Sequence, residues 1–189
     1  LLVFRTNASY DRYWEGRRLL GGIIIRSRDL ARQIAVWLPG DALAEEREHL
    51  RNLIVAHYRL VAQSLRTENE LGKLEKLLDA GERDQLEKVT ARPQVVTRWL
   101  SSRLAELVKT GSLTEQRLFA LDQNITVLTD CFAGCERIAR TPVPFAYAQH
   151  IKTLVVLFCF TAPFAMSADM KWYTPLASGI LAFALFGID

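Results

Sequence analysis

The spacing of apolar positions predicts helices along most of the chain. Apolar residues recur every three or four positions in long stretches, and no stretch alternates apolar and polar residues as a half-buried strand does. The 10 glycines and 6 prolines punctuate the 189 residues only sparsely, which leaves room for long helices. The pattern therefore predicts an all-α protein.

Two long helices are expected in the first third of the chain. The first runs from about residue 2 to residue 38, where Pro39 and Gly40 end it, and Asp41 is placed to cap the next helix. At about 1.5 Å per residue, the first helix is a rod of roughly 50 Å. The second, from about residue 42 to residue 66, buries one apolar stripe that includes His57. We interpret His57 as a core histidine with satisfied hydrogen bonds.

The middle of the chain combines a charged segment with two further helices. Residues 67–92 are rich in charge, which favours short, solvated helices, and a helix follows Pro93 and ends near Gly111. Beyond it, apolar and small residues follow a strict three-four spacing at Leu118, Leu121, Ile125, Leu128, Phe132, Cys135 and Ala139. This seam predicts a helix that packs lengthwise against its neighbours until Pro142 and Pro144 end it.

The last part of the chain has the composition of membrane-spanning helices. From residue 153 to residue 189 the charged side chains are only Asp169, Lys171 and Asp189. A helix needs about 20 mostly apolar residues to cross a bilayer, so residues 143–166 predict one crossing, a link at residues 167–171 follows, and residue 172 begins a second. Tyr147, Trp172 and Tyr173 suit the membrane interfaces. The alternative is a buried hairpin of a soluble protein, because the second run is short.

Basic residues predict how these segments are oriented. Arg137, Arg140 and Lys152 precede or begin the first crossing, whereas the link carries only Lys171, so the positive-inside rule places the charged middle of the chain in the cytoplasm. We expect three parts: residues 1–25 as the inner end of a membrane helix that continues into the cytoplasm, residues 26–142 as a cytoplasmic helical region, and residues 143–189 as a transmembrane hairpin. Both ends read as cuts through a longer, multi-pass membrane protein.

Charge and candidate chemistry argue against several functions. The net charge of +3 is small and interspersed, which does not favour a nucleic-acid surface. His49, His57 and His150 have no metal-ligand spacing with one another or with Cys131 and Cys135, and no nucleophile elbow or phosphate-binding glycine loop occurs. We therefore expect no enzyme, no catalytic residue, no metal and no cofactor.

Two segments carry a resemblance to a known family. The first is Phe4-Arg5-Thr6-Asn7-Ala8-Ser9-Tyr10-Asp11-Arg12-Tyr13-Trp14-Glu15-Gly16-Arg17, and the second is Cys135-Glu136-Arg137-Ile138 with Thr141-Pro142-Val143-Pro144-Phe145-Ala146-Tyr147. Both resemble the bacterial bestrophins, and with the helical pattern between them the resemblance covers essentially the whole chain. It implies a homopentameric ion channel in the bacterial inner membrane, with a central pore, four membrane helices per subunit and a large cytoplasmic bundle.

The resemblance also implies pore residues. Phe4 matches the last apolar ring of the family's pore neck, where an ion stripped of water meets a desolvation barrier. Asp11 and Glu15 lie four residues apart, close to the helix face that carries Phe4, and rings of their carboxylates would concentrate cations below the neck. The alternative, which we favour, is that these carboxylates pair with Arg12, Arg18 or a neighbouring helix. An ungapped comparison places a second, cytoplasmic aperture near Gln116.

We therefore expect a passive channel for monovalent ions. Its partners would be other copies of the chain, membrane lipids and the permeating ions. For ion selectivity, Asp11 slightly favours cations, and chloride conduction is the alternative. The alternative function is a non-conducting membrane scaffold or partner-binding assembly that uses the same helices.

Overall fold

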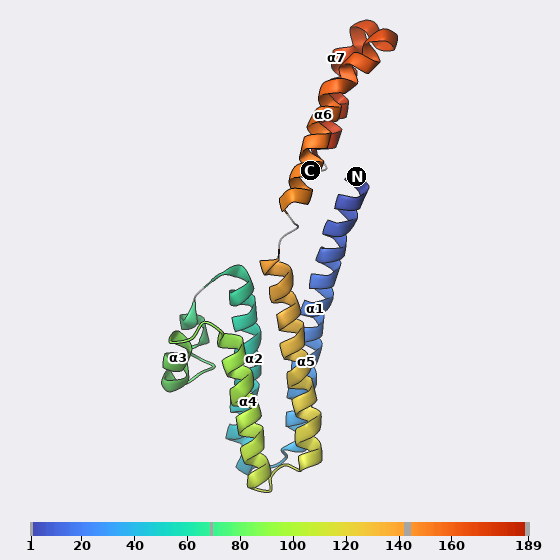
Figure 1. Cartoon of the computed structure of the whole chain (residues 1–189). Helices are drawn as coiled ribbons and strands as arrows, with labels where there is room; N and C mark the ends of the chain where they lie inside the picture. The colour runs from blue at the N-terminus through green and yellow to red at the C-terminus, as the bar shows by residue number, and fades with distance from the viewer. Residues whose placement is uncertain (1, 69, 142–144, 188–189) are drawn as a thin grey trace. The chain divides into compact units, whose positions relative to one another are not determined.

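The structure is a computed structural model that describes residues 2–68, 70–141 and 145–187. Side chains are described within these ranges except at residues 2–6, 73 and 145–148. Every regular element in the described ranges is a helix, in agreement with the predicted all-α class (Figure 1). The chain divides into two compact units, Leu1–Trp14 with Thr141–Asp189, and Glu15–Arg140.

The unit Glu15–Arg140 is a helical bundle. It contains most of α1 (Leu2–Trp37), then α2 (Ala44–Arg66), α4 (Arg92–Lys109) and α5 (Glu115–Arg140), which lie side by side (Figure 1). The shorter α3 (Ala80–Glu87) and the 3-10 turns η1 (Asp41–Leu43) and η2 (Leu71–Leu74) connect them. The charged segment 67–92 thus forms short helices, as predicted, although Leu74, Leu78 and Leu86 are buried.

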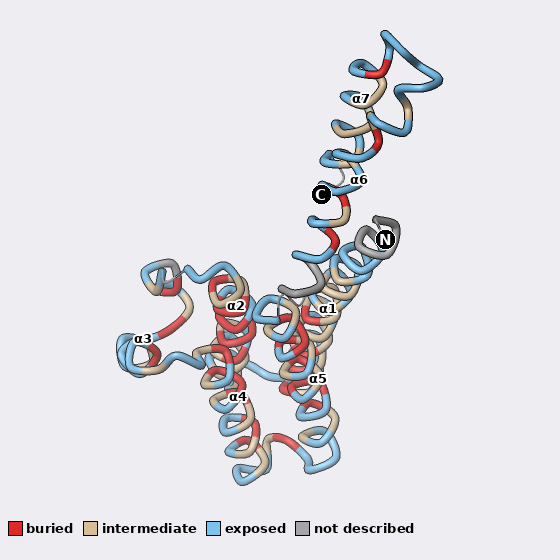
Figure 2. The backbone as a smooth tube through the Cα atoms, turned by 45° about the horizontal axis from the view of Figure 1, so that its top comes forward, coloured by how far each residue is buried: buried red, intermediate tan, exposed pale blue. Residues whose placement is uncertain are grey.

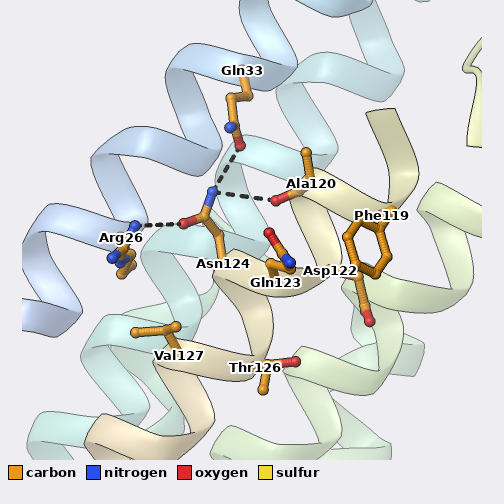
Figure 3. Close-up of a pocket in the computed structure, with 9 residues that line it drawn as sticks. All are labelled: Arg26, Gln33, Phe119, Ala120, Asp122, Gln123, Asn124, Thr126 and Val127. Atoms are coloured by element: carbon orange, nitrogen blue, oxygen red, sulfur yellow. Dashed lines mark hydrogen bonds between the residues drawn. The ribbon is translucent and has the colours of Figure 1, made fainter. Parts of the chain in front are cut away.

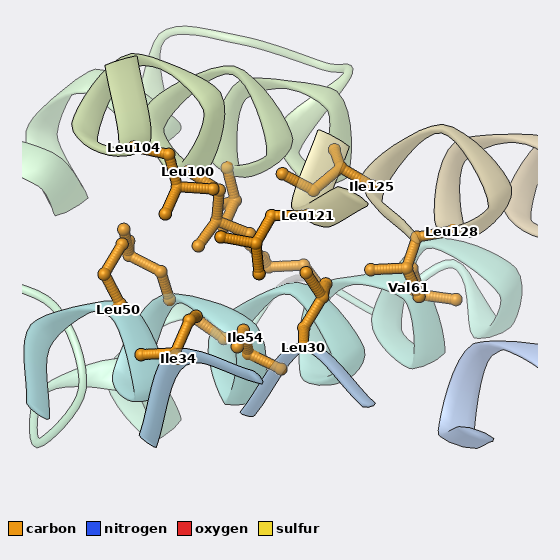
Figure 4. Close-up of a cluster of buried hydrophobic side chains, with 14 of the residues drawn as sticks. Leu30, Ile34, Leu50, Ile54, Val61, Leu100, Leu104, Leu121, Ile125 and Leu128 are labelled. Atoms are coloured by element: carbon orange, nitrogen blue, oxygen red, sulfur yellow. The ribbon is translucent and has the colours of Figure 1, made fainter. Parts of the chain in front are cut away.

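The core of this bundle is built from the apolar stripes that the sequence predicts. Buried residues line the facing sides of the helices (Figure 2), and the close-up shows how they meet (Figure 4). The contributors include Leu30 and Ile34 from α1, Leu50, Ile54 and Val61 from α2, Leu100 and Leu104 from α4, and Leu121, Ile125 and Leu128 from α5. Removing apolar surface from water at this seam, at about 25 cal/mol per Å², is the main force that holds the bundle together.

Helix ends agree with the predictions in part. α4 ends at Lys109 and Gly111 follows with φ of 75°, a left-handed conformation that glycine adopts without strain, and Pro93 lies in the first turn of α4, both as predicted. The prediction that Asp41 caps the second helix is wrong. Asp41 begins the 3-10 turn η1 instead, α2 starts after Leu43, and neither start has a side-chain cap. The extra 3-10 turn moves Asp41 three residues upstream of α2.

The other unit contains a helical hairpin, α6 (Phe145–Met170) and α7 (Thr174–Gly187), joined by η3 (Lys171–Tyr173). The segment Gln149–Gly187 is long and apolar enough to cross a membrane, with a mean hydropathy of 1.7, and only 17% of its most apolar window is buried. A core hairpin of a soluble protein is mostly buried, so this low burial favours lipid or other helices as its surroundings. The turn falls at Lys171–Tyr173, slightly later than predicted, because α6 continues to Met170.

Candidate ion pathway

α1 carries three of the four predicted pore residues. It is one α-helix of 36 residues, Leu2–Trp37, so Phe4, Asp11 and Glu15 lie on the same element. The Phe4 side chain lies outside the described residues. Asp11 is exposed and has no hydrogen-bond or ion-pair partner among the described residues, whereas Glu15 is part of an ion pair.

Glu15 pairs with Arg137 across the bundle. The Arg137 guanidinium donates to Glu15 Oε1 at 2.9 Å, with the side chains 68% and 40% exposed respectively. The partner thus comes from a neighbouring helix, α5, which is the alternative to a free carboxylate ring. An exposed pair of this kind contributes only about 0 to 1 kcal/mol to stability, but it neutralises the charge that Glu15 would otherwise present to ions.

The predicted aperture residue Gln116 lies in the first turn of α5 and is exposed. The next residue, Arg117, fastens this end of α5 to the end of α1, because its guanidinium donates to the Trp37 carbonyl oxygen at 3.4 Å and lies 6.0 Å from the centre of the Trp37 ring. Gln116 therefore lies on the surface of the bundle, next to the contact between the ends of α1 and α5.

Glycines hold α1 and α5 close together. A Cβ atom on Gly134 would lie 2.8 Å from Leu19 Cδ1, and one on Gly22 would lie 2.9 Å from Cys131 Sγ. The missing side chain of each glycine thus leaves a notch in its helix, which Leu19 occupies beside Gly134 and Cys131 occupies beside Gly22. Glu15 beside Arg137, Gly22 beside Cys131 and Trp37 beside Arg117 show that the two helices run antiparallel.

A polar cluster lies between α1 and α5 that the sequence reasoning missed (Figure 3). Asn124 is only 7% exposed, accepts a hydrogen bond from Arg26 Nη1 at 3.1 Å, and donates from Nδ2 to Gln33 Oε1 at 2.9 Å. The cluster borders a groove of about 600 Å³ that Phe119 also lines. The sequence does contain a sign of this cluster: Asn124, a polar residue, stands directly before Ile125 of the apolar seam, where its amide needs hydrogen-bond partners.

The bundle also contains buried and half-buried titratable groups, one histidine and two cysteines. His57 is fully buried and neither ring nitrogen has a hydrogen-bond partner among the described residues, so the expectation of a satisfied histidine is wrong. Burial lowers its pKa from 6.5 to about 4. Burial also raises the pKa of the Cys131 and Cys135 thiols, which keeps them neutral. Within the described parts of the chain, no three His, Cys, Asp or Glu residues gather into a metal site.

An exposed apolar hairpin and a long helix that continues into a charged helical bundle are features of helical membrane proteins. All 189 residues match the family described as bacterial/fungal bestrophin protein. This chain therefore belongs to the bacterial and fungal bestrophin family, as the resemblance in the sequence predicted.

Individual relatives agree with this assignment. The chain is 37% identical to a voltage-dependent anion channel-forming protein of Nostoc sp. over its full length, and 32% identical to a protein of the same description from Escherichia coli K12. It spans 62% and 61% of those proteins, respectively. A crystal structure of a mutant bacterial bestrophin homologue from Klebsiella pneumoniae superposes with a TM-score of 0.93 at 28% identity, covering 100% of this chain and 69% of that one.

Proposed function

We propose that this protein is a subunit of a homopentameric channel that conducts monovalent ions passively across the bacterial inner membrane. The observation that carries the proposal is α1. One unbroken helix holds Phe4 near one end and continues, with exposed charged residues such as Asp11 and Arg18, into a four-helix bundle. Five such helices around an axis turn each inward-facing residue into a ring of five, which suits a pore.

Phe4 is the proposed hydrophobic gate. A ring of phenylalanine side chains forms an apolar constriction that water does not readily fill. An ion must lose part of its hydration shell to pass, and this desolvation cost is a barrier to conduction. Phe4→Ala in the full-length protein, recorded in planar lipid bilayers, should increase single-channel conductance several-fold. Wild-type protein that assembles but gives no current supports the non-conducting scaffold instead, and a Phe4→Ala variant with wild-type currents removes Phe4 from the neck.

The sign of the conducted ion divides into two candidates. The cation preference expected from the sequence now depends on Asp11, because Arg137 neutralises Glu15. Anion conduction is supported by the relatives, which are called anion channel-forming, and by Arg18, an exposed cation on α1 with no partner in the described parts of the chain.

Reversal potentials in a salt gradient separate these two candidates. If Asp11 sets selectivity, Asp11→Asn should move the reversal potential towards that of an anion-preferring channel, because five negative charges leave the pathway. An unchanged potential removes Asp11 from the mechanism. Glu87→Gln is the matched control: it removes an exposed carboxylate from α3, outside the proposed pathway, so we expect no change in the reversal potential.

A further inference from the structure

The bundle has an outward face on α1 that no other helix of the same unit covers. Arg28 and Ile25 are exposed there, and Arg28 has neither a hydrogen-bond nor an ion-pair partner in the described residues. Its position follows from Arg26, which lies two residues earlier and bonds Asn124 on α5. Two residues correspond to a rotation of about 200° around a helix, so Arg28 points away from the α5 of its own chain.

α5 offers an acidic counterpart. Asp122 lies two residues before Asn124 on the exposed side of α5, where it borders both the α1–α5 groove and a groove between α4 and α5. Asp122 is exposed and lines a groove of about 420 Å³ between α4 and α5, together with Asp130, Ser101, Thr97, Gln94 and Arg98. Ser101 donates to Asp122 Oδ1 at 3.2 Å, which orients the carboxylate and leaves its charge without a cationic partner in the described residues.

Arg28 and Asp122 also lie at nearly the same height along the helix pair. Gly22 lies beside Cys131, and the two helices are antiparallel, so Arg28, six residues after Gly22, is level with Ile125, six residues before Cys131. Asp122 is less than one helical turn from Ile125. A rotation about an axis that runs along these helices moves each residue around the axis without changing its height, so copies keep Arg28 level with this part of α5.

We infer that the outward face of α1 from one copy packs into the α4–α5 groove of the next copy, with Arg28 of α1 paired to Asp122 of α5. The inference rests on the proposed function, since it requires copies arranged around an axis. Within one chain Arg26 joins α1 to Asn124 of α5. Between chains Arg28 joins α1 to the α4–α5 groove of the next copy. A head-to-tail interface of this kind forms a ring around a central pathway when its rotation closes.

Disulfide cross-linking of the full-length protein in membranes tests the inference directly. Arg28→Cys combined with Asp122→Cys, or with Thr126→Cys one turn further along the exposed side of α5, should form covalent dimers and higher multimers on oxidation. The wild-type protein gives the background of Cys131, Cys135 and Cys159. The matched control pairs Arg28→Cys with Glu87→Cys, an exposed position on α3 outside both surfaces, and should give no multimers above this background.

Charge reversal provides a second measurement that does not depend on cross-linking geometry. Arg28→Glu should weaken assembly on native gels, raising the protein concentration for half-assembly about tenfold, because five like-charged pairs replace five opposite ones. Adding Asp122→Arg should restore assembly. Lys109→Glu, an exposed reversal on α4 away from the groove, should have no effect.

Several results overturn the inference. The first is an assembled protein in which neither double-cysteine variant cross-links. The second is cross-linking by Arg28→Cys alone, which places position 28 beside the same position of another copy or beside a native cysteine. The third is an Asp122→Arg change that fails to rescue Arg28→Glu. Conduction is recorded separately on the wild type. Cross-linked multimers without current reject only the channel function, and current without cross-links rejects only this interface.

Discussion

Mild acid should destabilise the helical bundle through His57. This side chain of α2 is fully buried, and neither ring nitrogen has a partner within the described ranges. Burial alone lowers its pKa, with no contribution from a charged neighbour. The charged residues of the adjoining helix faces are exposed rather than turned towards the core: Arg51 and Arg59 on α2, Arg98 and Arg103 on α4, and Asp122 and Asp130 on α5.

The size of the effect follows from proton linkage. The folded pKa of about 4 lies below the unfolded value of 6.5, so between these values the unfolded chain binds more protons and stability falls as pH falls. The contribution is complete above about pH 6.5 and is lost as the pH falls through 4. At pH 5 the free energy of unfolding should be about 2 kcal/mol lower than at pH 8, and below pH 4 the loss should approach about 3 kcal/mol.

Denaturant unfolding of the purified protein, followed by circular dichroism between pH 8 and pH 4.5, measures this loss. His57→Leu replaces the ring with an apolar side chain of similar size, so about 2 kcal/mol of the wild-type difference between pH 8 and pH 5 should disappear. His49→Gln, which removes the other histidine of α2, should leave the His57 contribution in place. If His57→Leu and the wild type lose stability in parallel on acidification, the histidine is solvated or paired and the reasoning is wrong.

Two substitutions test the α1–α5 contact. Gly134→Ala introduces a Cβ only 2.8 Å from Leu19 Cδ1, whereas a Cβ at Gly21 meets no atom within 4 Å. Both substitutions gain about 1 kcal/mol of helix propensity, but only Gly134→Ala overpacks the contact, so we expect the Gly21→Ala variant to have a free energy of unfolding about 1 to 3 kcal/mol higher. Equal values would show that Leu19 moves aside freely. Asn124→Ala removes the partner of Arg26 and Gln33 and should lower the midpoint of thermal unfolding, with a loss of about 1 to 3 kcal/mol. An unchanged midpoint would mean that water replaces the amide.

The sequence by itself determined that the long elements are α-helices. Three- and four-residue spacing encodes which face of a helix is buried, so the helices, the seam of α5 and the apolar hairpin could all be predicted, and the bestrophin motifs gave the family. The glycine and proline signals located the ends of α4 for the same reason: they act on the local backbone. Asp41 failed as a cap because an intervening 3-10 turn, not the local sequence signal, sets where α2 starts.

Only the tertiary structure decided which residues meet. Arg137 is 122 positions from Glu15, and periodicity carries no information on partners at that distance, so neutralisation of the predicted carboxylate became visible only when α1 and α5 were placed side by side. The same holds for the Gly134 notch beside Leu19, and for His57, whose lack of partners depends on what the neighbouring helices present to it. A helical pattern fixes the direction of a side chain, whereas charge and hydrogen bonding depend on what lies opposite.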